Sequence, residues 1–258
     1  MVKNKIKLLY MLGFVSLTSC LLFKTNTPPE PKKILFIGNS ITSNNHLSGI
    51  FDTLARLNNY SMDSELITYP GVGLTNHFFS KISVAPEGYS ITKALQKGDT
   101  SFTMSAIINS NWDYIYLQGK GIYEEELSKV VSSIENLSSI KQCTFLIFQN
   151  YSTAVWSEEI REKKVKQLTD SLISLSALEN VHIINVGELF NWCYINHPEV
   201  SVLSEDLHPT ALGTFLIALL IYKTVFPTSP NEASLSFLYR KLNATEREVI
   251  TDVLTLKL

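Results

Sequence analysis

The residue types needed for acyl transfer stand at two distant points of this chain. Ser40 follows the apolar run Ile34–Ile37 and lies two residues after a glycine that permits a tight turn. His208 follows two acidic residues, Glu205 and Asp206. A serine becomes a useful nucleophile when a base takes its proton and a third group orients that base. The residues therefore indicate a serine nucleophile with a histidine base.

Both residues also have simpler interpretations. Ser40 has the type and the position of a helix N-cap or turn residue. Pro209 suits the first position of a helix, so we expect His208 at a helix start, where Asp206 and His208 act as caps. The positive end of that helix would disfavour an imidazolium, while a nearby carboxylate acts in the opposite direction and orients the ring. Local sequence leaves the capping and the catalytic interpretations open.

Short apolar runs alternate with longer amphipathic stretches from Lys33 onward. Continuous apolar runs are typical of parallel strands that are covered on both faces. The predicted strands are Ile34–Ile37, Ser64–Thr68, Tyr114–Leu117, Thr144–Phe148 and His182–Val186. The predicted helices are Leu47–Leu57, Ile91–Leu95, Ala106–Asn109, Glu124–Ile140, Ser157–Leu178, Pro209–Thr224 and Thr245–Leu256. This order predicts a three-layer α/β/α sandwich around a doubly wound, mainly parallel sheet of about five strands.

In open parallel sheets, ligands bind beyond the carboxyl ends of the strands. Polar or glycine-containing segments follow four of the predicted strands, namely Gly38–Thr42, Tyr69–Gly73, Gln118–Gly121 and Gln149–Tyr151. The segment Ser204–Pro209 precedes the last long helix. A hydroxyl, two glycine loops, amides, an acid and an imidazole are therefore expected at one edge of the sheet.

Three of these segments resemble the motif blocks of SGNH (GDSL-like) hydrolases, in an exported branch of that superfamily. Ile34–Thr42 resembles the first block, in which Gly-Asp-Ser follows the first strand and the serine is the nucleophile. Glu205–Pro209, followed by Gly213, resembles the last block, Asp-x-x-His, which supplies the acid and the base. Gly71 fits the block whose backbone N–H lines the oxyanion hole. The resemblance spans about residues 32–225.

The chain departs from the family pattern at three places. Asn39 replaces the aspartate that precedes the nucleophile. The family's acid lies three residues before the histidine, which slightly favours Glu205 over Asp206, and both remain candidates. The third block, Gly-x-Asn-Asp, is missing, because the chain contains no Asn-Asp pair. At the equivalent strand end, Gln118 offers a similar amide donor and Lys120 offers a positive charge.

The resemblance implies an exported serine esterase that acts through an acyl-enzyme, with O-acyl groups on a glycan as one substrate class. Ser40 would attack the ester, His208 would take its proton, and the N–H groups of Ser40 and Gly71, with Gln118, would stabilise the oxyanion. Four further residues are candidates for substrate contact: Asn39, His77, Lys120 and Asn150. No metal or cofactor is required. Because losing one oxyanion donor typically costs about 10²–10³ in rate, the alternative is a catalytically weakened, glycan-binding envelope lipoprotein.

Residues 1–19 have the pattern of an export signal. Three lysines among the first seven residues precede the short apolar run Leu8–Leu17, which is shorter than the roughly 20 residues of a membrane-spanning helix. Leu17-Thr18-Ser19-Cys20 resembles the lipobox of bacterial lipoproteins, although an ordinary signal with an incidental cysteine is the alternative. The resemblance implies a lipid on Cys20, a tether over residues 20–31, a hydrolase domain over residues 32–258 and a lipid-anchored location in the bacterial cell envelope.

Composition excludes several other classes of protein. The chain has 258 residues, with 22 basic and 24 acidic side chains and a net charge of −2. It has no basic excess for binding nucleic acid, and 45% hydrophobic residues exclude disorder as its main state. Three cysteines without a C-x-x-C pair do not make a disulfide framework or a zinc site. Cys143 and Cys193 are expected in the core, with a single disulfide as the alternative.

Overall fold

Five parallel strands form one sheet in the structure, which is a computed structural model that describes residues 30–79, 110–119, 132–137 and 142–256. The strands are β1 (Lys32–Gly38), β2 (Met62–Thr68), β3 (Tyr114–Leu117), β4 (Thr144–Phe148) and β5 (Val181–Ile184). Their order is β2-β1-β3-β4-β5, and every neighbouring pair is parallel. The chain leaves β1 first toward β2 and then toward β3, so the order reverses beside the carboxyl end of β1, where such sheets bind ligands.

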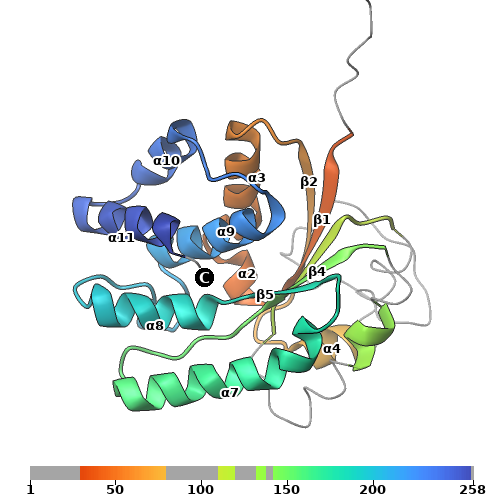
Figure 1. The fold of residues 1–258 in the computed structure, drawn as a ribbon, viewed down its shortest axis with the longest axis horizontal. Helices are drawn as coiled ribbons and strands as arrows, with labels where there is room; N and C mark the ends of the chain where they lie inside the picture. The colour runs from red at the N-terminus through yellow and green to blue at the C-terminus, as the bar shows by residue number, and fades with distance from the viewer. Residues whose placement is uncertain (1–29, 80–109, 120–131, 138–141, 257–258) are drawn as a thin grey trace, which may run out of the picture. The chain divides into compact units, whose positions relative to one another are not determined.

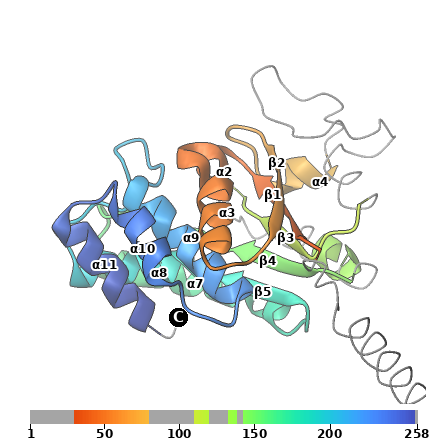
Figure 2. The ribbon, with the colours of Figure 1, turned by 90° about the horizontal axis from the view of Figure 1, so that it is seen from above.

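Helices cover both faces of this sheet, which confirms the predicted α/β sandwich (Figure 1). Their bounds are α2 (Ser40–Ser43), α3 (Leu47–Leu57), α4 (Leu74–Phe79), α7 (Glu158–Ser176), α8 (Val186–Asn196), α9 (Ala211–Val225), α10 (Glu232–Tyr239) and α11 (Ala244–Thr255), with a 3₁₀ turn η1 (Asn44–His46) between α2 and α3. Residues 132–137 are also helical. The two helices that flank the predicted nucleophile and base, α3 and α9, lie side by side (Figure 2).

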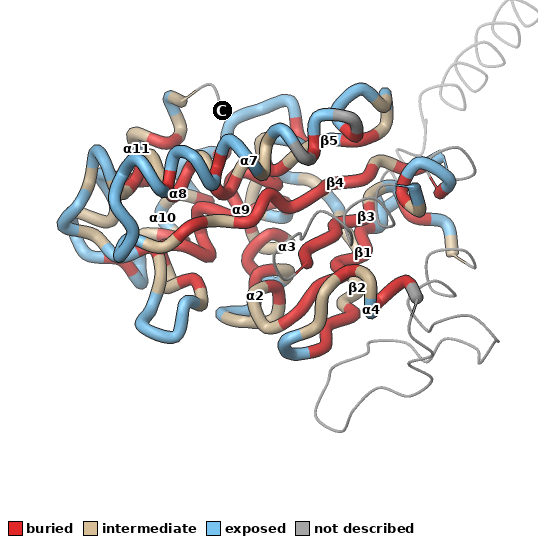
Figure 3. The backbone as a smooth tube through the Cα atoms, turned by 90° about the horizontal axis from the view of Figure 1, so that it is seen from below, coloured by how far each residue is buried: buried red, intermediate tan, exposed pale blue. Residues whose placement is uncertain are grey.

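Two apolar cores explain why the strands are continuously hydrophobic. In β1, Ile34 and Phe36 contact the core formed with α3, α8, α9, α10 and α11, whereas Leu35 and Ile37 contact the core formed with α4 and α7. Successive side chains of a strand point to opposite faces, so both sets must be apolar when both faces are covered. The buried strands pass through the middle of the domain, and the outer surface of α7 is exposed (Figure 3).

Several predicted strands and helices agree with the structure. The bounds of β3, β4 and α3 are those predicted, whereas β5 ends at Ile184 because Val186 already begins α8. The structure adds α2, α4, α8 and α10. The predicted helices over residues 91–95 and 106–109 lie outside the described residues, as does most of the one predicted over residues 124–140.

The last long helix begins later than predicted. Its first residue is Ala211, and Thr210 is the N-cap, whose side-chain oxygen accepts the Gly213 N–H at 3.2 Å. Pro209 lies in an isolated bridge with Leu203 instead of at the first helical position. The prediction that His208 stands at a helix start is therefore wrong, and His208 belongs to the loop before α9.

The described residues include two of the three cysteines, and their helices can be compared with the length that a membrane span requires. Cys143 and Cys193 are both buried, and they are not joined in a disulfide. Within residues 30–256, as far as they are described, no helix is long and apolar enough to cross a membrane. Cys20 and the export signal lie outside the described residues.

Candidate active site

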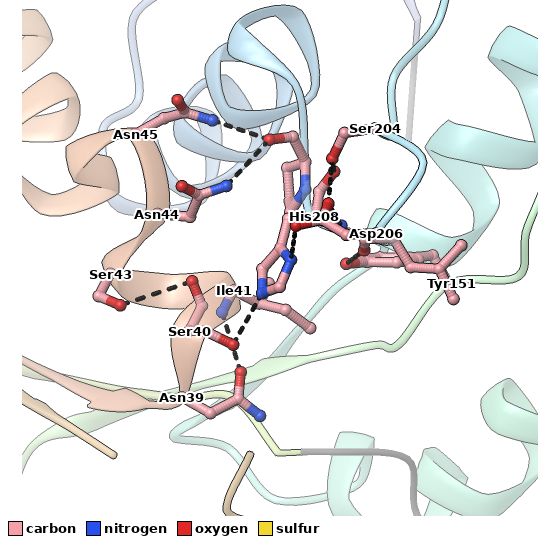
Figure 4. A network of polar contacts seen from close by, with 12 residues as sticks. Asn39, Ser40, Ile41, Ser43, Asn44, Asn45, Tyr151, Ser204, Asp206 and His208 are labelled. Atoms are coloured by element: carbon pink, nitrogen blue, oxygen red, sulfur yellow. Dashed lines mark hydrogen bonds and ion pairs between the residues drawn. The ribbon is translucent and has the colours of Figure 1, made fainter. Parts of the chain in front are cut away.

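The structure brings the predicted serine and histidine together. Ser40 is the first residue of α2, directly beyond β1, and its Oγ lies 2.8 Å from Nε2 of His208 (Figure 4). The two residues are 168 positions apart in the sequence. The packing of α3 against α9 brings their segments together, since α3 follows Ser40 and α9 follows His208. A hydroxyl within hydrogen-bond distance of an imidazole is the geometry of a nucleophile and its base.

The carboxylate that contacts the other side of the imidazole is that of Asp206. Its Oδ2 lies 3.0 Å from Nδ1 of His208, so the ring stands between Ser40 and Asp206. Glu205, which the family register slightly favours, is exposed, and so is Asp206, so the contact with the ring and not burial distinguishes the two acids. The contact therefore makes Asp206 the stronger candidate for the orienting acid, against the slight preference for Glu205.

The backbone of the loop explains this choice. Leu207 has a left-handed conformation with φ 66°. The loop is closed by two backbone hydrogen bonds, from Leu207 N–H to the Ser204 carbonyl at 3.0 Å and from Ser204 N–H to the His208 carbonyl at 2.9 Å. The chain thus reverses direction between Asp206 and His208. As a result, the residue two positions before the histidine faces its ring, instead of the residue three before.

Hydrogen bonds hold the Asp206 carboxylate in its charged form. The Ser204 hydroxyl lies 2.6 Å from Oδ1 of Asp206 and 2.7 Å from the His208 carbonyl. The backbone N–H of His208 donates to the same Oδ1 at 3.3 Å. These contacts, that of Ser204 first, lower the pKa of Asp206 below its ordinary value. The carboxylate is therefore ionised at neutral pH, as an acid that orients a histidine must be.

Gln118 supports the turn that carries the nucleophile. Its Oε1 accepts the Asn39 N–H at 3.0 Å and the Thr42 hydroxyl at 2.9 Å, and its Nε2 donates to the Gly119 carbonyl at 2.6 Å. The side chain is completely buried. Both ends of this carboxamide are thus engaged by protein groups, so its geometry is that of a positioning residue and departs from the predicted oxyanion donor.

The glycine before the nucleophile is required by close packing. A Cβ on Gly38 would lie 2.2 Å from Oγ1 of Thr42 and 2.8 Å from Oε1 of Gln118. Any larger residue would separate the amide of Gln118 from the turn that it holds. The first motif block therefore contains glycine because two buried side chains close over it.

Asn39 connects the nucleophile turn to the glycine loop after β2. Its Oδ1 accepts the Ile41 N–H at 3.0 Å, which caps α2, and its Nδ2 donates to the Val72 carbonyl at 3.0 Å. An aspartate at this position has no proton to give to a carbonyl. Because both atoms of its amide are engaged within the protein and the side chain is buried, Asn39 positions the two loops instead of facing substrate.

Two backbone N–H groups remain as candidate oxyanion donors. Ser40 is the first residue of α2, where helical N–H groups have no intrahelical acceptor. Gly71 is exposed and has φ 69°, and a Cβ built on it would meet nothing within 4 Å. The space beside Gly71 is therefore open, and its positive φ favours glycine. The Asn39–Val72 hydrogen bond holds these two loops in register.

The remaining predicted site residues differ in where they lie. His77 is 1% exposed, and its Nε2 lies 2.8 Å from the Gly38 carbonyl, so it supports the end of β1 instead of lining an open pocket. Burial lowers the pKa of His77 to about 4, which keeps the ring neutral. Asn150 follows β4 and is buried, and its Nδ2 has no hydrogen-bond partner among the residues that the structure describes. Lys120 lies outside the described residues.

Tyr151 lies in a segment that the sequence predicts at this edge, although the sequence assigns it no contact with the acid and base loop. Its hydroxyl donates to the Leu207 carbonyl at 2.9 Å (Figure 4). Its ring centroid lies 5.0 Å from that of Phe190. It therefore supports the left-handed residue between Asp206 and His208. The only signal in the sequence is its position just beyond the end of β4, at the edge where ligands bind.

The five-stranded parallel sheet and the order of these segments along the chain are those of an SGNH-like hydrolase fold. No protein-family model matches the chain, and no curated protein was found to match it. Solved structures do match. A DUF4886 family protein from Bacteroides uniformis shares 14% identity with a TM-score of 0.65, covering 87% of this chain and 93% of the other. Axe2, an acetylxylan esterase from Geobacillus stearothermophilus, shares 12% identity with a TM-score of 0.54, covering 75% and 94%. LAE5, an α/β hydrolase from the metagenome of Lake Arreo in Spain, shares 13% identity with a TM-score of 0.52, covering 74% and 94%.

Proposed function

We propose that this protein is a serine esterase that hydrolyses its substrate through an acyl-enzyme. The observation that carries the proposal is the continuous contact from Ser40 through His208 to Asp206 at the carboxyl edge of the sheet. The fold shared with an acetylxylan esterase and an α/β hydrolase supports it.

In the first half of the reaction, Ser40 Oγ attacks the ester carbonyl carbon while His208 Nε2 takes the hydroxyl proton. Asp206 stabilises the resulting imidazolium through Nδ1–H. The N–H groups of Ser40 and Gly71 donate to the oxygen that becomes negatively charged. His208 then gives its proton to the leaving alkoxide, and the acyl group stays on Ser40.

In the second half, a water molecule attacks the acyl-enzyme. His208 takes a proton from the water, and the same two N–H groups stabilise the second oxyanion. Collapse of this intermediate breaks the bond to Ser40 Oγ, which recovers its proton from His208. The products are a carboxylic acid and the free enzyme.

The substrate class and the location extend this proposal. We propose an O-acylated glycan as substrate, supported by the acetylxylan esterase among the structural neighbours. The lipobox-like sequence supports export and attachment to the envelope through a lipid on Cys20. Incorporation of labelled palmitate into the wild type and not into Cys20→Ala is expected, and equal labelling would contradict the anchor.

The decisive experiment compares two serine variants in the same short helix. On p-nitrophenyl acetate, Ser40→Ala is expected to lose at least about 10³-fold in kcat/KM, whereas Ser43→Ala keeps most of the activity. A serine-reactive phosphonate should label the wild type and leave Ser40→Ala unlabelled. Activity of Ser40→Ala equal to that of the wild type would remove the proposal.

One observation favours a second candidate, a glycan-binding protein with little catalysis. The carboxamide of Gln118, at the strand end where the family places its oxyanion asparagine, is committed to protein groups. Calorimetric binding of an acylated oligosaccharide by a wild-type protein that resists phosphonate labelling would favour this candidate over the esterase.

A further inference from the structure

A third contact joins the segments that carry the nucleophile and the base. Nδ2 of Asn45 lies 2.8 Å from the Pro209 carbonyl and 3.1 Å from Oγ1 of Thr214. Asn45 lies five residues after Ser40, and Pro209 follows His208 directly. Figure 4 shows the side chains of Asn44 and Asn45 converging on this carbonyl, with the imidazole of His208 just below it. The contact therefore acts on the backbone next to the imidazole.

The Pro209 carbonyl needs a partner from outside its own segment. Pro209 is buried and precedes the N-cap of α9, so its carbonyl lies ahead of the helix. The first carbonyl that α9 uses is that of Thr210, which accepts the Thr214 N–H at 2.9 Å. A buried carbonyl is normally hydrogen-bonded. Asn45 supplies this bond at 2.8 Å, and Asn44 adds a longer contact at 3.4 Å.

The backbone at Asn45 is in an unusual conformation. Asn45 has φ 50° and ψ 18°, and His46 has φ 57° and ψ 51°, so two consecutive residues are left-handed. This conformation is uncommon outside glycine, and asparagine tolerates it better than most residues. Strained residues of this kind persist when surrounding contacts hold them. Here the left-handed turn between α2 and α3 directs the Asn45 amide at the segment that carries His208.

We propose that Asn45 is a positioning residue that holds His208 Nε2 at reacting distance from Ser40 Oγ. The inference rests on the proposed esterase function. The loop before Pro209 is largely exposed, with Asp206 and Leu207 both in solvent, so it depends on a few contacts for its place. Because acyl transfer is sensitive to small displacements of the base, losing the Asn45 contact should slow the chemical step without changing substrate affinity.

The test replaces the donor and keeps the backbone. Asn45→Gly tolerates the left-handed conformation and removes the amide. It is expected to lower kcat on p-nitrophenyl acetate by about 10–100-fold with KM unchanged, and to slow phosphonate labelling of Ser40 equally. Asn59→Gly is the matched control, because Asn59 is also left-handed, with φ 64°, and lies exposed at the end of α3. It should keep the wild-type kcat.

Two kinetic results with the glycine variants would overturn the inference. One is a folded Asn45→Gly protein with the wild-type kcat, even if its thermal midpoint is lower, because that pattern belongs to a purely structural residue. The other is an equal loss of kcat in Asn59→Gly. If Asn45→Gly does not fold, Thr214→Val replaces it, since this variant removes the second partner of the Asn45 amide. It should lower kcat by a few-fold, and an unchanged kcat would count against the inference.

A spectroscopic readout separates this inference from the esterase proposal. In ¹⁵N spectra of the imidazole, Ser40→Ala should shift the His208 signals of the wild type, because the two side chains are in contact. The same substitution in the Asn45→Gly background should shift them little. This comparison of NMR signals does not require the protein to have esterase activity. An equal shift in both backgrounds would contradict the role of Asn45, whatever Ser40 does in catalysis.

Discussion

The Asp206 carboxylate lies 3.0 Å from Nδ1 of His208, although a single residue separates them in the sequence. The separating residue, Leu207, is left-handed, and the turn it makes brings Oδ2 of Asp206 to the ring while Oδ1 accepts the His208 N–H. In the proposed mechanism, one short loop thus supplies both the base and its orienting acid.

The choice of acid is tested by exchanging each carboxylate for its amide. Asp206→Asn should lower kcat by at least about 10²-fold, because the amide no longer stabilises the imidazolium. Glu205→Gln, its matched control, should change kcat less than about twofold, as expected for an exposed group outside the reacting chain. Steady-state kinetics at neutral pH measure both. A large loss in Glu205→Gln with a small one in Asp206→Asn would reverse the assignment.

Ser204 is expected to keep Asp206 charged and aligned. Ser204→Ala removes a hydrogen bond to a charged acceptor, so kcat should fall by about 3–30-fold. Without this bond, the pKa of Asp206 should rise toward its ordinary value, which carboxyl NMR titration can follow. Ser201→Ala, an exposed serine before the same loop, is the control. An unchanged Asp206 titration in Ser204→Ala would show that the hydroxyl bonds only to the His208 carbonyl.

The left-handed conformation of Leu207 should cost stability. Leu207→Gly is expected to raise the free energy of unfolding by about 0.5–1 kcal/mol, because glycine adopts positive φ without steric cost. Leu207→Ala loses the same half-exposed side chain and keeps Cβ, so it should show no such gain. Urea unfolding of the three proteins measures the difference. Equal stability of the glycine and alanine variants would mean that the conformation carries little strain.

His77 should make stability depend on pH in the acidic range. Burial lowers the pKa of His77 to about 4, below the usual value of 6.5. Between these values the unfolded chain binds the proton more readily, so the free energy of unfolding falls as pH falls from 6.5 to 4. The total effect is on the order of 3 kcal/mol.

The variant His77→Gln tests this dependence. Its amide can still donate to the Gly38 carbonyl, and it does not titrate. Urea unfolding at pH 7 and at pH 4.5 should show a smaller difference between the two pH values for His77→Gln than for the wild type. Identical differences in the two proteins would place the pH dependence on other groups.

The sequence by itself determined the sheet and the edge at which the site lies. Tyr114–Leu117 and Thr144–Phe148 are predicted to the residue, because strands buried on both faces must be apolar throughout. The glycine and serine after the first strand, and the histidine before the last long helix, follow from the same pattern. These features depend on local periodicity and on chain order, which a sequence displays directly.

Only the tertiary structure decided what each polar side chain does. Gln118 was a candidate oxyanion donor and Asn39 a candidate substrate contact, yet both amides bond inside the protein, to the Ser40 turn and to the Val72 carbonyl. Asp206 contacts the His208 ring because of one left-handed residue, and Asn45 reaches Pro209 across 164 positions. Hydrogen bonds to such groups depend on angles and distances between remote segments. Spacing along the chain does not encode these quantities, so they emerge only when the segments pack.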